Sequence, residues 1–124
     1  MTQIDVTEVM KLVVVMRHDL GMSKGKIASQ ACHAAVVCAL DAEKNRPEAF
    51  AEWEACGRRV VILRADSLGE LEDVLKRAPG KGVFASLMVD AGLTQVAPMT
   101  PTCVGLGPDT DMAIDEVTEG LRLF

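Results

Sequence analysis

The sequence lacks the features that mark several common classes of protein. No apolar run reaches the roughly 18 residues that a membrane span requires, and the first residues have neither the basic start nor the hydrophobic stretch of a signal peptide. The chain contains two histidines, and it has no His-Glu-x-x-His motif that could hold zinc on a helix. We therefore expect a cytoplasmic protein that makes no membrane contact and has no structural or catalytic zinc site.

The four cysteines form no Cys-x-x-Cys pair and lie in apolar segments. Metal sites and redox motifs need clustered thiols, so we expect small buried residues in a reducing compartment. Trp53 is the only tryptophan, and its spacing from other apolar residues predicts a packing role, with stacking on a nucleotide base as the alternative. The cysteines are Cys32, Cys38, Cys56 and Cys103.

The net charge of −5 at pH 7 at first argues against a nucleic-acid partner. The charges are, however, unevenly placed along the chain. Residues 11–26 contain four cations and one anion, whereas residues 109–124 contain five acids and one arginine. A basic region on an acidic body is compatible with docking of a phosphate backbone at one face, with binding that weakens as the salt concentration rises.

The chain has 124 residues, 49% of them apolar, which is the length of one domain with a single core. Residues 1–10 show no periodic pattern, so we expect a loosely held arm there and one domain over residues 11–124. The order of predicted elements is β-α-α-β-α-β-β-α, and the strands are buried runs rather than alternating ones. This pattern predicts the α/β class, as a three-layer α/β/α sandwich on a four-stranded mixed, mostly parallel sheet.

Local signals place the individual elements. Ser23, Ser67 and Asp109 are the expected N-caps of three helices, and Glu70 stands at the capping-box position after Ser67. Pro47 opens a further helix. The short connection over residues 90–101 is the expected place of an antiparallel pairing. The predicted strands cover residues 12–16, 60–63, 83–89 and 102–106.

The stretch of residues 11–40 carries most of the candidate chemistry. A helix begins at Lys24, and helical spacing places Lys26, Gln30 and His33 in one stripe, which we expect to face outward or into a cleft. The alternative is that this stripe is an ordinary solvated helix face on which the histidine has no function. Both lysines lie in the first turn, where free N–H groups already attract anions, so they favour phosphate or carboxylate binding. The small residues expected to pack on the sheet are Ala28, Ala31, Cys32, Ala35 and Ala39.

A second candidate group follows the third predicted strand. Asp90 stands directly after that strand, and Gly92 permits a turn that leaves the carboxylate at the strand's C-terminal edge, where open α/β sheets bind ligands. Thr94 and Gln95 follow within reach, and Thr102 opens the next strand. The alternatives are that Asp90 only caps the turn through its own backbone and that Thr102 is an ordinary strand residue.

Three blocks of the sequence follow one another in an order that is typical of a known family. The run VVVMRHDLGMSKGKIASQACHAAV, residues 13–36, combines a strand, an Arg-x-Asp-Leu turn, a basic glycine loop and a helix with Gln and His-Ala-Ala. The run SLMVDAGLTQVAPMTPTCVGLGP, residues 86–108, adds Asp-Ala-Gly-x-Thr-Gln, and IDEVTEGLRLF, residues 114–124, forms the ending. Together the blocks resemble the archaeal and eukaryotic (type two) peptidyl-tRNA hydrolases. The chain departs from the family pattern at His18, at Glu119 and at Met99, which stands where a glycine is usual.

The resemblance implies hydrolysis of the ester that joins a peptide's C-terminal carbonyl to the ribose of the terminal adenosine of tRNA. A positioned water, a base and an oxyanion-stabilising group suffice for an ester, without metal or cofactor. Peptidyl-tRNA is then the partner, and a homodimer is expected because similar proteins are often dimers. The implied catalytic residues are Lys26, His33, Asp90, Thr94 and Thr102. The implied substrate- and tRNA-binding residues are Arg17, Lys24, Gln30 and Gln95.

The division of roles within this set stays open. Either Asp90 or His33 orients and deprotonates water, and either Lys26 or Lys24 supports the oxyanion or the 3′-terminal phosphates. A nucleophilic serine or cysteine is disfavoured, because the chain has no Gly-x-Ser-x-Gly elbow and no evident triad. The competing class is a non-catalytic anion- or tRNA-binding module or a scaffold of the same fold.

Overall fold

The computed structural model describes residues 9–90 and 96–124, and the predicted order of strands and helices is confirmed within them. Most of the predicted N-terminal arm, as well as Thr94 and Gln95, lies outside the described residues, and Met10 is the first residue of the first strand. The elements are β1 (Met10–Arg17), α1 (Lys24–Asn45), α2 (Pro47–Ala55), β2 (Val60–Ala65), α3 (Leu68–Arg77), the 3₁₀ turn η1 (Pro79–Lys81), β3 (Ala85–Asp90), β4 (Thr100–Thr110) and α4 (Asp111–Val117).

The described strands form one mixed sheet in the order β2-β1-β4-β3. β1 pairs with β2 in parallel, whereas β4 runs antiparallel to both of its neighbours. The predicted antiparallel pairing across residues 90–101 is therefore confirmed. The sheet is mixed, as predicted, but its pairing is not mostly parallel: β1, β2 and β3 point in the same direction, and because β4 separates β1 from β3, only one of the three adjacent pairs of described strands is parallel.

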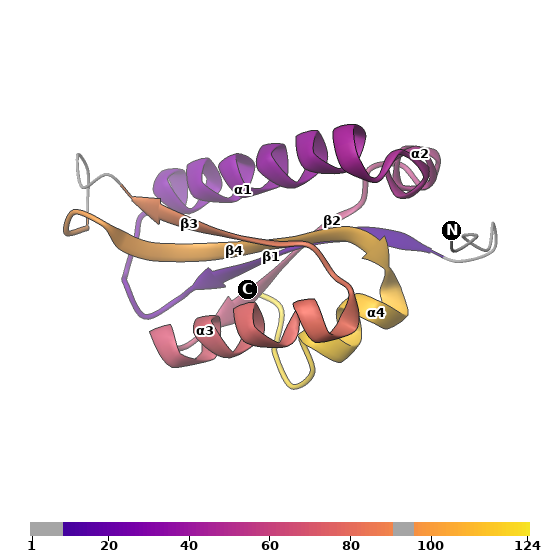
Figure 1. Cartoon of the computed structure of the whole chain (residues 1–124). Coiled ribbons are helices and arrows are strands. Elements are labelled where there is room, and N and C mark those ends of the chain that lie inside the picture. The colour runs from indigo at the N-terminus through magenta and orange to yellow at the C-terminus, as the bar shows by residue number, and fades with distance from the viewer. Residues whose placement is uncertain (1–8, 91–95) are drawn as a thin grey trace.

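Helices cover both faces of the sheet (Figure 1). α1 and α2 lie on one face, and α3 and α4 lie on the other. Alternate residues of β1 pack against opposite helix layers. Val13 and Val15 pack toward α3 and α4. Leu12, Val14 and Met16 pack toward α1 and α2. Because both faces of β1 are covered, its sequence is an unbroken apolar run rather than an alternating one.

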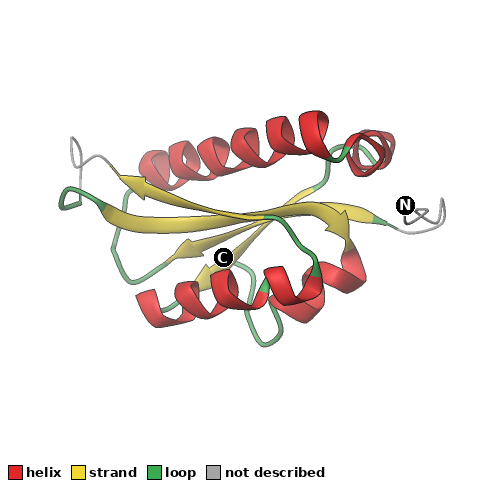
Figure 2. Cartoon of the chain, viewed as in Figure 1, coloured by secondary structure: helices red, strands yellow, loops and turns green. Residues whose placement is uncertain are grey.

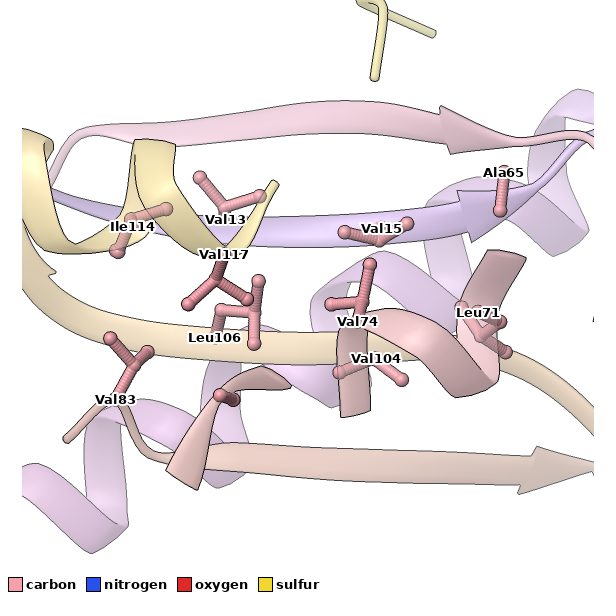
Figure 3. Close-up of a cluster of buried hydrophobic side chains, with 11 residues drawn as sticks. Val13, Val15, Ala65, Leu71, Val74, Val83, Val104, Leu106, Ile114 and Val117 are labelled. Atoms are coloured by element: carbon pink, nitrogen blue, oxygen red, sulfur yellow. The ribbon is translucent and has the colours of Figure 1, made fainter. Parts of the chain in front are cut away.

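The core beneath α3 and α4 consists of aliphatic side chains alone (Figure 3). Leu71 and Val74 come from α3, and Ile114 comes from α4; all three are fully buried. Burying one such side chain stabilises the folded state by about 1.5–3 kcal/mol. The cluster therefore stabilises the sheet, and the polar groups of the opposite layer are held on that sheet. The other members are Val13, Val15, Ala65, Ala78, Val83, Val104, Leu106 and Val117.

The structure corrects the predicted orientation of α1. Ala28 and Cys32, which we expected to pack on the sheet, are exposed, whereas Gln30 and Cys38 are buried against it. The helix can approach β4 closely because Gly105 has no side chain: a Cβ added there would lie 2.6 Å from the Cys38 Sγ. The residues buried along α1 are Gln30, Ala34, Cys38 and Ala42.

The predicted N-caps are confirmed at Ser23 and Ser67, whose hydroxyls accept hydrogen bonds from the backbone N–H groups of the first helical turns. The prediction that Asp109 caps α4 is wrong. Thr110 caps that helix, and the Asp109 carboxylate instead accepts a hydrogen bond from the Thr110 N–H. The packing role predicted for Trp53 is confirmed, because the side chain is buried and its indole N–H donates to the Arg59 carbonyl oxygen.

The cysteines differ in burial. Cys38 and Cys103 are fully buried, as predicted, and burial raises their thiol pKa values to about 12 and about 11. Cys56 is half-buried, and Cys32 is exposed, so the prediction of burial is wrong for Cys32. The sequence pattern misled here because Cys32 lies among alanines, which pack equally well on either side of a helix.

The last residues of the chain return to the sheet after α4 (Figure 2). Leu123 forms an antiparallel bridge with Leu63 of β2, and the Phe124 N–H donates to the Ile62 carbonyl oxygen at 3.0 Å. The Phe124 ring also contacts the ring of His18, with 5.3 Å between the ring centres. Of the described helices, none combines the length and apolarity needed to cross a membrane.

Candidate functional site

The candidate residues gather at one edge of the sheet. Because β4 runs against β1 and β3, the start of β4 lies at the same edge as the ends of the other two strands. Arg17 ends β1, Asp90 ends β3, and Thr102 lies near the start of β4. Lys26 reaches this edge from the first turn of α1. The fold thus unites residues from the two separate blocks of sequence that we singled out.

A direct ion pair between Lys26 and Asp90 lies at the centre of this group. The Lys26 Nζ is 2.5 Å from the Asp90 Oδ1, and the two side chains are only 8% and 7% exposed. Such a pair loses most of its hydration, and removal of one partner commonly costs about 3–5 kcal/mol. The pair therefore supplies two chemical groups in contact within one site, a carboxylate that can accept a proton and a cation that can stabilise developing negative charge.

A second buried contact joins α1 to β4 beside this pair. The Thr102 hydroxyl lies 2.6 Å from the Gln30 Oε1 and 3.3 Å from the Met88 carbonyl oxygen, and it donates to the nearer acceptor. Thr102 is fully buried and Gln30 is 6% exposed. Gln30 follows Lys26 by one helical turn, so its amide fixes the position of the lysine-bearing turn against β4.

Lys24 and His33 do not join this cluster. Both residues are exposed, and neither side chain forms a hydrogen bond or ion pair with another residue in the part of the chain that the structure describes. The predicted stripe of Lys26, Gln30 and His33 is therefore divided: the first two point toward the sheet, and the histidine points to solvent. Lys24 remains at the N-terminal end of α1, where the positive helix end favours anions.

Arg17 is engaged within the protein. Its Nε and Nη2 donate to the two carboxylate oxygens of Asp19 at 3.0 Å and 2.7 Å, and its Nη1 donates to the Pro101 carbonyl oxygen at 3.2 Å. The hydrogen bonds from Arg17 hold the pKa of Asp19 below its usual value. Asp19 was not among the predicted site residues, although its position two residues after an arginine is a signal for such a pair.

The connection after β3 places a methionine in an unusual backbone conformation. Met99 has φ +63°, a left-handed conformation that glycine adopts more readily, and its N–H donates to the Asp90 carbonyl oxygen at 2.8 Å. This is the position at which the chain departs from the glycine of the family pattern. Across residues 9–90 and 96–124, no three histidine, cysteine or acidic side chains are placed to hold a metal ion together.

The sheet, the helices on its two faces and the polar edge define an α/β protein whose site combines a buried lysine–aspartate pair with a glutamine–threonine contact. A model of the family described as "Peptidyl-tRNA hydrolase PTH2" matches residues 10–124. The chain therefore belongs to the PTH2 family.

Individual relatives agree with the family match. The chain is 42% identical over 116 residues to a peptidyl-tRNA hydrolase of Thermoplasma volcanium, covering 94% of this chain and 99% of the relative. It is 43% identical over 115 residues to that of Methanocaldococcus jannaschii, covering 93% and 100%. It is 40% identical over 114 residues to the human protein named mitochondrial peptidyl-tRNA hydrolase 2, covering 92% of this chain and 64% of the human one.

The fold is also found in a distant solved structure. A protein of unknown function from Agrobacterium tumefaciens superposes with a TM-score of 0.53 at 10% identity, covering 93% of this chain and 97% of that one. At this identity the similarity shows a shared fold alone.

Proposed function

We propose that the protein is a peptidyl-tRNA hydrolase, which cleaves the ester between tRNA and a peptide or N-acyl amino acid and releases tRNA for reuse in translation. The observation that carries this proposal is the direct contact of Lys26 with Asp90 at the sheet edge, in a chain whose relatives are named for this activity. The substrate class follows from the family, and the buried pair supplies the groups that the reaction needs.

In the proposed mechanism, Asp90 acts as the general base. Its carboxylate takes a proton from a water molecule, the water oxygen attacks the ester carbonyl carbon, and the Lys26 ammonium stabilises the oxyanion. When the carbon–oxygen bond breaks, the ribose 3′-oxygen leaves and receives the proton from Asp90. General-base catalysis of this kind contributes about 10²–10⁴-fold. Asp90 is favoured over His33 because the carboxylate lies against the lysine, whereas the histidine is exposed.

The remaining residues either hold the catalytic groups in place or bind and position the substrate. Gln30 and Thr102 keep the lysine-bearing turn against β4 through their buried contact. The exposed Lys24 binds the 3′-terminal phosphates of tRNA at the positive end of α1. Thr94 and Gln95, proposed from the resemblance alone, position the ester and the tRNA.

The test is release of N-acyl amino acid from N-acyl-aminoacyl-tRNA with EDTA present throughout. We expect metal-independent turnover by the parent, a loss of at least about 10²-fold for Asp90→Asn and for Lys26→Met, and near-parent turnover for His33→Ala. Lys44→Ala is the matched control, since it removes an exposed lysine at the far end of the same helix.

Two outcomes would contradict the proposal. Turnover of Asp90→Asn within a few-fold of the parent would remove Asp90 from the mechanism, and collapse of His33→Ala would assign the base to the histidine. Well-folded parent protein that binds tRNA without hydrolysing the ester would instead indicate a non-catalytic tRNA-binding module, a function that a basic first helical turn also suits.

The assembly and location form part of the proposal. Val36 and Leu40 lie one turn apart on α1 and are 53% and 60% exposed, which supports a homodimer that buries this apolar face. Sedimentation of the parent as a dimer, and of Leu40→Glu as a monomer, is the expected result. We place the protein in the cytoplasm, where peptidyl-tRNA arises during translation. Imaging of the tagged chain in its source cells tests the location.

A further inference from the structure

We propose that Arg17 is a positioning residue that clamps the loop before α1, residues 18–23, to the start of β4, and that it does not bind the phosphates of tRNA. This inference rests on the proposed function, because the effect to be measured is on hydrolysis of the tRNA ester. It changes the role that the sequence implied for Arg17.

The guanidinium group is occupied by protein acceptors. Three of its nitrogen atoms donate hydrogen bonds to other groups of the protein. Two donate to the Asp19 carboxylate in a forked arrangement, and one donates to the Pro101 carbonyl oxygen. The Arg17 side chain is only 11% exposed, and Asp19 is 33% exposed. A phosphate would have to displace a carboxylate that is already held by two charge-assisted hydrogen bonds.

One of the three contacts, to Pro101, joins parts of the chain that are far apart in sequence, and the other two are local. The pairing of β1 with β4 ends at Met16 and Cys103. Pro101 lies two residues beyond this point, toward the start of β4. From there, the Arg17 side chain continues the connection by donating to the Pro101 carbonyl oxygen. On its other side it holds Asp19, the second residue of the loop that leads to α1.

The two ends of this clamp adjoin the proposed catalytic groups. Pro101 precedes Thr102 directly, and the loop from Asp19 ends at Ser23, which caps the turn that carries Lys26. Loss of the clamp lets the lysine-bearing turn move relative to β4. A displacement of about 1 Å in a catalytic group can cost roughly 10²-fold in rate.

The experiment measures kcat and KM with N-acyl-aminoacyl-tRNA, and the salt dependence of tRNA binding, for Arg17→Lys, Arg17→Gln and Asp19→Asn. We expect each variant to lose at least tenfold in kcat with KM changed by less than twofold, and the slope of log Kd against log salt to stay at the parent value. Lysine keeps the charge but cannot form the fork, so Arg17→Lys should fail like the others.

Two further variants calibrate these readouts. Lys24→Gln removes an exposed cation and should lower the salt slope by about 0.7–0.9, as expected for the loss of one phosphate contact. Arg64→Lys disrupts a second arginine–aspartate pair of the same spacing, formed with Asp66 at 2.9 Å at the end of β2. β2 lies at the opposite side of the sheet from Asp90, so kcat should stay at the parent value.

The inference is overturned if Arg17→Gln lowers the salt slope as Lys24→Gln does, or if Arg17→Lys and Asp19→Asn keep the parent kcat. Thermal unfolding shows whether each variant is folded. If an Arg17 variant does not fold, Asp19→Asn tests the clamp in its place. If the parent protein shows no turnover, only the proposed function fails. The salt dependence of tRNA binding still tests the clamp: an unchanged slope for Arg17→Gln would support it, and a reduced slope would exclude it.

Discussion

The close packing of α1 on β4 predicts a measurable cost for Gly105→Ala. A Cβ at this position would lie 2.6 Å from the Cys38 Sγ and 3.1 Å from the Ala34 carbonyl oxygen. Atoms in ordinary contact lie about 3.5–4.0 Å apart, so the helix must move outward by roughly 1 Å. The substitution therefore tests whether the position of α1 depends on the missing side chain.

Two opposing effects set the size of the loss. Overpacking of this kind costs about 1–3 kcal/mol, and replacement of glycine by alanine recovers about 0.5–1 kcal/mol through the smaller entropy of the unfolded chain. We expect the free energy of unfolding to fall by about 1–2 kcal/mol. Lys26 and Gln30 lie on the displaced helix, so turnover of N-acyl-aminoacyl-tRNA should also fall, by roughly tenfold or more.

Urea unfolding and steady-state turnover together check this prediction. Cys38→Ala removes the nearest clashing atom, so the double variant should be more stable than the sum of the two single effects implies, by about 1 kcal/mol. A Gly105→Ala protein with parent stability would refute the packing argument. Reduced stability with unchanged turnover would refute only the link between helix position and catalysis.

Three other substitutions have defined outcomes. Lys26→Met should lower the free energy of unfolding by about 3 kcal/mol, and addition of Asp90→Leu should recover much of that loss in urea unfolding while the protein stays inactive. Met99→Gly should raise stability by about 0.5–1 kcal/mol, because glycine adopts φ +63° without strain and the methionine is 73% exposed; a lower urea midpoint would contradict this. Burial raises the pKa of Asp109 above 3.8, so its ionisation costs stability as the pH rises through the folded-state pKa. Asp109→Asn should therefore be more stable than the parent at pH 7, with a difference that disappears below about pH 4 in thermal unfolding at both pH values.

Short-range signals predicted the elements well. The apolar run of β1 indicated a strand covered on both faces, and β1 is indeed an interior strand of the sheet. Ser23 and Ser67 were recognisable as caps because the stabilising contact lies within three residues. At the end of β4 two adjacent residues could cap α4, and a local rule cannot decide between Asp109 and Thr110, because the strand's course determines which of them turns into the helix.

The sequence could not orient α1 or predict the full length of β4. Alanine and cysteine occur on several sides of α1, so the apolar pattern specifies no buried face, and a buried polar residue such as Gln30 contradicts the usual assumption. Its partner, Thr102, lies 72 residues away in the chain. β4 continues through Gly105, Gly107 and Pro108, residues that locally predict an end to the strand. Their roles depend on the helix and strand packed against them, which only the complete fold supplies.

The return of the last residues to β2 covers part of an outer strand of the sheet. An outer strand with unpaired N–H and C=O groups is a template on which another chain can add a strand and begin to aggregate. Here Leu123 and Phe124 occupy part of that template through their backbone contacts with Leu63 and Ile62. Removal of residues 122–124 would expose this strand, and light scattering during mild heating should then show earlier aggregation than in the parent. We therefore expect these three residues to protect the outer strand β2 against pairing with another chain.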